Sequence, residues 1–212
     1  MASFLHTLKP IQILPKEEKP KEQKPAVVMP IPETKVVEKV VEKLIIEEQS
    51  TKLSQNAIWG PLLWRILHIL AEQVGKTKPA LIQTDEVQKW IQMMRAVEKT
   101  MPCALCRGHY KEWLSKHSLN ELALLRGKAF REAARKYVWQ LHENVNTSRS
   151  VSSGIPLERC EELYSSWEQL QETFDKFANF IQELISAGKF KGEGFTEFRK
   201  QLIYVRKLAD CI

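Results

Sequence analysis

The sequence Met101-Pro102-Cys103-Ala104-Leu105-Cys106-Arg107-Gly108-His109-Tyr110 holds two of the chain's four cysteines, with two residues between them. A C-x-x-C pair closes a small disulfide ring that an attacking thiolate opens easily, so such pairs are more often redox-active or metal-binding than structural. Pro102 favours a helix that begins here, and the dipole at its N-terminus would lower the pKa of a first-turn thiol. The motif predicts a redox disulfide or half of a zinc site, with His109 as third ligand.

A second motif lies upstream, where Gly60, Trp64 and His68 follow one another at intervals of four residues. This spacing places the three residues on one face of a helix. A small residue, a flat aromatic ring and an imidazole together form a face suited to a planar ligand. For this helix taken alone, however, the more frequent role of Trp64 and His68 is core packing.

A third motif lies downstream and contains Trp139, His142 and Asn146. His142 and Asn146 are four residues apart and therefore lie one turn apart on the same helical face. With Trp139, such a helix can hold a polar heterocycle. The alternative is a solvated helix end.

The three motifs in this order resemble the Erv/ALR family of FAD-linked sulfhydryl oxidases. That family reads G-x3-W-x3-H, then C-x-x-C often followed by R-x-H-F/Y, then H-N-x-V-N, and the resemblance covers about residues 57–168. The matching residues are Gly60, Trp64, His68, Cys103, Cys106, Arg107, His109, Tyr110, His142, Val145 and Asn146. Glu143 departs from the family's usual asparagine, and the family's lysine after V-N has no clear counterpart. Arg149 is the nearest cation to that position.

The resemblance implies a thiol oxidase that uses FAD to form disulfides and reduces oxygen to hydrogen peroxide. In this reading Cys103 is the sulfur that exchanges with substrate, and Cys106 is the sulfur nearer the flavin. The cofactor-binding residues would be Gly60, Trp64, His68, His109, Trp139, His142, Asn146 and Arg149, with no metal. The implied partners are a dithiol protein or a thioredoxin-like carrier, and a second copy of the chain in a homodimer.

Two cysteines remain outside these motifs. Cys160 lies near a position where many family members have a structural cysteine, but the expected partner is absent because position 177 is Phe. Cys211 would be a substitute partner, a shuttle thiol or a lone thiol on a mobile end. Two unpaired cysteines are equally expected in a reducing compartment.

The composition of the chain indicates where the protein is located and which partners it binds. The 212 residues are 43% hydrophobic, and neither a secretory signal nor an apolar run long enough to span a membrane is visible. These features predict a cytoplasmic protein that binds no membrane. The R-x-H-Y sequence resembles viral members of the family, and this resemblance implies a virion or a viral assembly site as a further location. The net charge of +6 comes without a basic run interleaved with aromatics, so we expect no nucleic-acid binding.

The pattern of residues predicts three regions. Residues 1–50 form a tail with prolines at intervals of five and a short apolar segment at 37–45, which we expect to dock onto another protein. Residues 51–170 form the oxidase-like domain and residues 171–212 a C-terminal helical extension. The fold class is all-α, with a four- to five-helix bundle, an extended N-terminal tail and extra C-terminal helices. Helices are expected at residues 58–74, 86–100, 103–116, 119–125, 128–146, 157–170 and 195–209.

Two alternatives to the enzyme remain open at this point. The first is a catalytically weak or inactive protein that keeps the oxidase fold as a structural subunit of a viral particle or another assembly. The second is a zinc-binding interaction module that uses Cys103, Cys106, His109 and Cys160.

Overall fold

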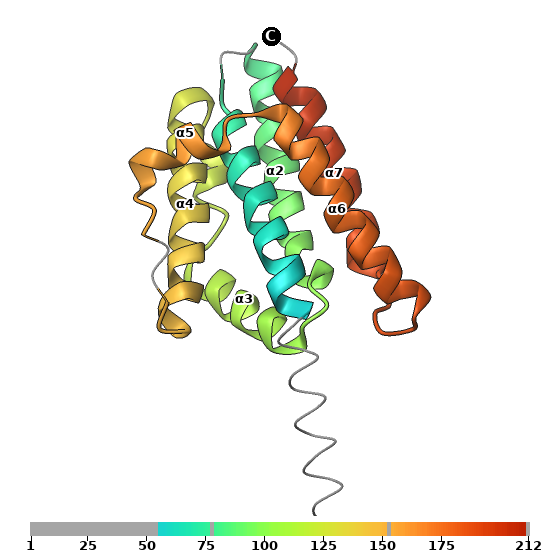
Figure 1. Cartoon of the computed structure of the whole chain (residues 1–212). Helices are drawn as coiled ribbons and strands as arrows, with labels where there is room; N and C mark the ends of the chain where they lie inside the picture. The colour runs from blue at the N-terminus through green and yellow to red at the C-terminus, as the bar shows by residue number, and fades with distance from the viewer. Residues whose placement is uncertain (1–54, 77–78, 152–153, 211–212) are drawn as a thin grey trace, which may run out of the picture. The chain divides into compact units, whose positions relative to one another are not determined.

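The computed structural model describes residues 55–76, 79–151 and 154–210, and these residues form a helical bundle (Figure 1). The chain is helical over residues 55–73, which we call the first helix. The remaining elements are α2 (Ala80–Thr100), α3 (Ala104–Lys116), η1 (Leu122–Leu124), α4 (Gly127–Ser148), η2 (Leu157–Arg159), α5 (Cys160–Tyr164), α6 (Trp167–Ser186) and α7 (Glu193–Asp210). No strand occurs among the described residues, so the predicted all-α bundle with extra C-terminal helices is confirmed.

Two helix boundaries differ from those predicted by the sequence. α2 begins at Ala80 after Pro79, and not at residue 86 as expected. The single helix predicted at 157–170 is broken, because α5 ends at Tyr164 and α6 begins at Trp167. The Ser166 hydroxyl accepts a hydrogen bond from the Gln169 amide at 3.3 Å, and this N-cap starts a new helix after the break.

The hydrophobic core continues through α6 and α7. α6 buries one face in which apolar residues recur every three or four positions, namely Leu170, Phe174, Phe177, Ile181 and Leu184. These side chains, except Leu184, belong to the same core as the first helix and α2. Because residue 170 lies inside α6, residues 171–186 continue a helix of the oxidase-like region, and side chains of α6 and α7 share its core.

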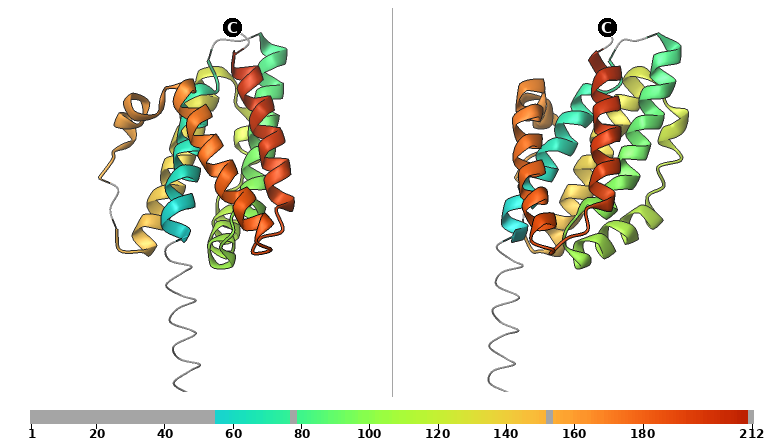
Figure 2. Two further views of the ribbon diagram at one scale, coloured as in Figure 1. Left: turned by 45° about the vertical axis from the view of Figure 1, so that its right-hand side comes forward. Right: turned by 90° about the vertical axis from the view of Figure 1, so that its right-hand side faces the viewer.

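The helices place three distant segments at one end of the bundle (Figures 1 and 2). The first helix begins at the lower end of Figure 1, and both α2 and α4 run down to that end. α3 then crosses the same end, and the turn between α6 and α7 also lies there. The C-x-x-C, the start of the Gly60 motif and the end of the His142 motif therefore share one end of the molecule.

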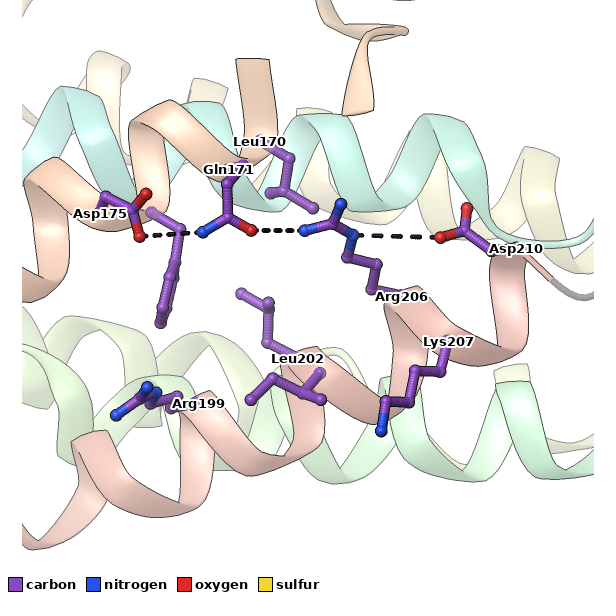
Figure 3. Close-up of a pocket in the computed structure, with 10 residues that line it drawn as sticks. Leu170, Gln171, Asp175, Arg199, Leu202, Arg206, Lys207 and Asp210 are labelled. Atoms are coloured by element: carbon purple, nitrogen blue, oxygen red, sulfur yellow. Dashed lines mark hydrogen bonds and ion pairs between the residues drawn. The ribbon is translucent and has the colours of Figure 1, made fainter. Parts of the chain in front are cut away.

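A groove of about 300 Å³ lies between α6 and α7 and is lined by side chains of both helices (Figure 3). Its polar groups pair mainly with one another. Gln171 donates a hydrogen bond to Asp175, Arg206 donates one to Gln171, and Arg206 also pairs with Asp210 at 4.0 Å. This ladder links the two helices across the groove, and we assign the groove a role in packing.

Candidate redox site

Cys103 and Cys106 are joined by a disulfide at the start of α3, with their Cα atoms 5.2 Å apart. Cys103 is the N-cap residue of this helix, and its sulfur accepts a hydrogen bond from the Cys106 amide at 3.2 Å. Both cysteines are half-buried and pack against the core. The predicted helix start at the motif is confirmed, and its first turn supplies an N–H donor to one of the two sulfurs.

The residues that follow the disulfide fix its position. The Arg107 guanidinium donates a hydrogen bond to the Met101 carbonyl at 2.6 Å, which closes the turn between α2 and α3. The buried Tyr110 hydroxyl donates to the Met94 carbonyl at 2.7 Å. Burial raises the pKa of Tyr110 well above its ordinary value, so this phenol stays protonated and serves as an anchor of α3 on α2.

Trp64, His68 and His142 come together from the first helix and α4. The Trp64 and His142 rings are stacked with their centroids 4.1 Å apart, and His68 Nε2 lies 3.0 Å from His142 Nδ1. His68 is only 4% exposed, and its other neighbour is the Tyr164 ring, stacked at 4.7 Å between centroids. Two motifs that are 74 residues apart therefore form one ring cluster.

Both imidazoles of this cluster are neutral at pH 7. Burial lowers the pKa of His68 to about 3, with a further lowering by His142. Burial lowers the pKa of His142 to about 4, against a smaller opposing effect of the Glu143 carboxylate. The hydrogen bond between the rings requires one nitrogen to accept, which two protonated imidazoles could not provide. The cluster thus offers neutral aromatic and imidazole groups to a ligand.

The space beside Gly60 suits a flat cofactor, but the space between the stacked rings does not. A Cβ atom on Gly60 would meet no atom within 4 Å, so the helix has an open surface one turn before Trp64. Because the Trp64 and His142 centroids are 4.1 Å apart, no third ring fits between them. A heterocycle would instead lie along the flank of the cluster. This donor set, with its uncharged rings and open glycine face, fits the ring system of a flavin.

The other four predicted cofactor residues lie on α3, on α4 and at the C-cap of α4. The Trp139 indole donates a hydrogen bond to the Ile155 carbonyl at 2.9 Å, and the Asn146 amide donates to Glu143 at 3.1 Å. Arg149 is exposed at the C-cap of α4, and His109 is exposed on α3. Neither Trp139 nor Asn146 contacts His68 or Trp64 by any described bond. The assignments of these four residues to the cofactor stay predictions.

A buried ion pair that the sequence did not predict joins the first helix to α4. The Glu72 carboxylate is 1% exposed and accepts a hydrogen bond from Arg135 Nε at 2.7 Å, and Arg131 Nη2 lies 3.6 Å away. Arg131 also bonds the Glu72 carbonyl and the Glu161 carboxylate. The missed Tyr164 belongs to the same region. Glu72 continues the four-residue interval of Trp64 and His68, and that interval is the one signal that pointed to it.

Cys160 is buried on α5, where burial raises the pKa of its thiol to about 11. Such a thiol is a weak nucleophile at neutral pH. Among the described residues, no three or more His, Cys, Asp or Glu side chains are arranged to hold a metal ion. The disulfide engages two of the four ligands that the zinc alternative requires. Cys211 and residues 1–50 lie outside the described residues, as do the predictions made for them.

A helical bundle that carries a C-x-x-C disulfide at a helix start and a tryptophan–histidine cluster between the first helix and α4 has the features of a thiol–disulfide oxidoreductase. The chain belongs to the Erv1/Alr family, which matches residues 61–168. It is similar to the FAD-linked sulfhydryl oxidase of African swine fever virus, with 33% identity over 88 residues, or 42% of this chain and 65% of that protein. The matched region is thus less than two thirds of the relative's length. No solved structure matches the chain.

Over residues 55–76, 79–151 and 154–210, no helix has both the length and the apolar character that a membrane span requires.

Proposed function

We propose that this protein is an FAD-dependent thiol oxidase that forms disulfides in a dithiol substrate and passes the electrons to oxygen, giving hydrogen peroxide. The observation that carries the proposal is the Cys103–Cys106 disulfide at a helix N-terminus, in a bundle that also brings Trp64 and His142 together in one ring cluster. The family and the name of the viral relative support the same activity.

The exchange step uses the two cysteines in distinct roles. A substrate thiolate attacks Cys103 Sγ, the Cys103–Cys106 bond breaks, and Cys106 leaves as a thiolate. The second substrate thiolate then attacks the substrate sulfur of this mixed disulfide and releases Cys103 as a thiolate. The substrate loses two electrons and two protons, and the enzyme dithiol holds them. The Cys106 amide, which bonds Cys103 Sγ at 3.2 Å, stabilises the released Cys103 thiolate.

The cofactor site would be formed by Trp64, His68 and His142, with the open face of Gly60 beside them. When bound, FAD supplies the two-electron acceptor that re-forms the disulfide and the route to oxygen. The neutral imidazoles contribute hydrogen-bonding groups without a positive charge. Asn146 at the end of α4 and the exposed cation Arg149 are proposed to contact the adenosine and phosphate part, where the family's lysine is missing.

The proposal extends to the partners and the location of the protein. We propose a dithiol protein or a thioredoxin-like carrier as the reductant, a homodimer as the assembly, and residues 1–50 as a segment that docks onto another protein. A cytoplasmic viral assembly site, or the virion, is the proposed location, and the viral source of the relative supports it.

The absorbance spectrum of the purified protein tests the proposal first. A flavin band between about 440 and 460 nm that disappears on anaerobic addition of dithiothreitol and returns with oxygen is the expected result. Cys106→Ser should keep the flavin and the fold but lose at least 100-fold in oxygen consumption with dithiothreitol, because no disulfide can form.

Cys160→Ser is the matched control, since it removes a buried thiol outside the exchange site and should retain turnover. A protein that folds but retains no flavin after reconstitution with FAD would instead support the structural-subunit alternative. Turnover by Cys106→Ser at the rate of the unaltered protein would contradict the mechanism.

A further inference from the structure

A second cavity lies beside the disulfide and was not anticipated by the sequence. It has a volume of about 450 Å³ and is lined by residues of the turn between α6 and α7, the end of α2 and the start of α3. Pro102 and Arg107 line it, and these residues directly flank Cys103 and Cys106. A group bound here would therefore lie next to the exchange sulfurs along the chain.

The lining of this cavity is strongly cationic. It contains four basic side chains, Lys99, Arg107, Lys189 and Lys191, against one acidic side chain, Glu193. Phe190 adds a half-buried aromatic surface. The three lysines are exposed, whereas Arg107 is half-buried and held by its bond to the Met101 carbonyl. A site of this charge attracts carboxylates.

The turn that supplies Lys189 and Lys191 is held in place against α2. Gly194 approaches Lys99 so closely that a Cβ atom would overlap with the Lys99 backbone. The Thr100 hydroxyl donates a hydrogen bond to the Gly194 carbonyl at 3.2 Å or to that of Ala96 at 2.9 Å. Gly192 has a positive φ of 73° and packs against Ile185. The two lysines are thus presented from an anchored turn.

We infer that this cavity docks an acidic polypeptide segment next to the thiols of the substrate protein. The inference rests on the proposed function and adds its substrate class, which is a protein whose dithiol is flanked by Asp or Glu residues. Residues 188–194 lie outside the family match at 61–168, so the selectivity belongs to the C-terminal part of this chain. Carboxylates at the cavity would raise the local concentration of substrate thiol at Cys103 and speed its association.

Binding to thiol-free peptides tests the docking independently of the redox chemistry. Two fluorescein-labelled peptides carry Ser-x-x-Ser in place of the dithiol, one with four flanking Asp and Glu residues and one with four Lys residues. Anisotropy at low salt should show that the acidic peptide binds the full-length protein at least tenfold more tightly, and that this preference weakens as salt screens the charges.

Charge reversal then locates the binding. Lys189→Glu/Lys191→Glu should weaken binding of the acidic peptide by roughly tenfold or more, because four units of charge change at the cavity. Lys136→Glu/Lys200→Glu makes the same net change at two exposed positions outside the cavity lining and should retain binding within about twofold. Circular dichroism confirms that both variants remain folded.

The same comparison with the dithiol peptides gives the selectivity of the reaction. The ratio of kcat/KM for the acidic over the basic peptide should fall by about the same factor in the cavity variant only. Equal binding of the two peptides, equal loss in both double variants, or full displacement by millimolar inorganic phosphate would overturn the inference, the last by showing a site for a small anion. Dithiothreitol oxidation by the unaltered protein reports separately on the proposed activity.

Discussion

At the scale of single residues, the site depends on two histidines that are held in their neutral form. Spacing alone predicts that His68 and His142 each lie on the ligand-facing side of a helix, but it cannot predict that the rings meet. The 3.0 Å contact between them depends on how the first helix and α4 cross. How two helices cross depends on the side chains that pack between them, which spacing within one helix does not show. The same limit explains why Tyr164, stacked on His68, carried no recognisable signal in the sequence.

The neutral histidines should make the stability depend on pH. Their folded pKa values, about 3 for His68 and about 4 for His142, lie below the ordinary value of 6.5. The unfolded chain therefore binds more protons below pH 6.5. The stability that each neutral histidine contributes is complete above pH 6.5, and it is lost as the pH falls toward 4 for His142 and toward 3 for His68. We expect the urea-unfolding free energy to fall between pH 7 and pH 5.5, with a limiting slope of about 1.4 kcal/mol per pH unit for each histidine.

His142→Gln tests this explanation. The variant should lose part of the slope between pH 7 and pH 5.5, whereas His109→Gln, at an exposed position on α3, should keep it. Carboxylates contribute mainly below this window, so they do not obscure the comparison. An unchanged slope in His142→Gln would show that the ring cluster is not the source of the pH dependence.

At the scale of elements, periodicity located most helices but not how they end or pair. Pro102 predicted the helix start at the C-x-x-C, and the amphipathic pattern at 195–209 predicted α7. The break at residues 165–166 was not predicted, because apolar spacing continues on both sides of it. Only the Ser166 side chain, which accepts a hydrogen bond from the Gln169 amide, marks the start of the new helix. The ion pair between Glu72 and Arg135 was also unreadable, since it joins two helices that the sequence keeps 63 residues apart.

We expect Arg135→Met to destabilise the protein by about 2–4 kcal/mol, because it leaves the buried Glu72 carboxylate with only the more distant Arg131. Glu72→Met/Arg135→Met removes both charges and should recover much of this loss. Lys176→Met breaks an exposed ion pair with Glu172 and should cost less than about 0.5 kcal/mol. Urea unfolding measures all three. A double variant that is less stable than Arg135→Met would show that the pair itself, and not the uncompensated carboxylate, provides the stability.

At the scale of the whole molecule, the family resemblance and the folded unit have different limits. The match ends at residue 168, whereas the core extends through α7. An amphipathic pattern at 195–209 predicted a helix but could not show which surface it covers. α7 lies against α2 and buries Phe195, Phe198, Leu202 and Val205. The C-terminal helices are thus needed to complete the bundle that carries the disulfide.

Two truncations follow from this difference. Deletion of residues 188–212 removes α7, and its four buried side chains contribute on the order of 6–12 kcal/mol at about 1.5–3 kcal/mol each. This is comparable with the whole stability of a typical domain, about 5–15 kcal/mol. The shortened chain should therefore fail to unfold cooperatively and should bind a hydrophobic dye. Deletion of residues 1–50, which have prolines every five residues and balanced charge, should leave the thermal midpoint and the flavin content unchanged.

Thermal unfolding followed by circular dichroism, with flavin absorbance on the same samples, distinguishes the outcomes. If residues 1–50 serve only to dock onto another protein, their deletion lowers incorporation into the native assembly and nothing else. Loss of flavin in that variant would place the tail within the catalytic fold and move the boundary near residue 50. A cooperative, flavin-containing protein after deletion of residues 188–212 would show that the bundle is complete without α7. In that case the turn that carries Lys189 and Lys191 could be replaced without lowering the stability of the bundle.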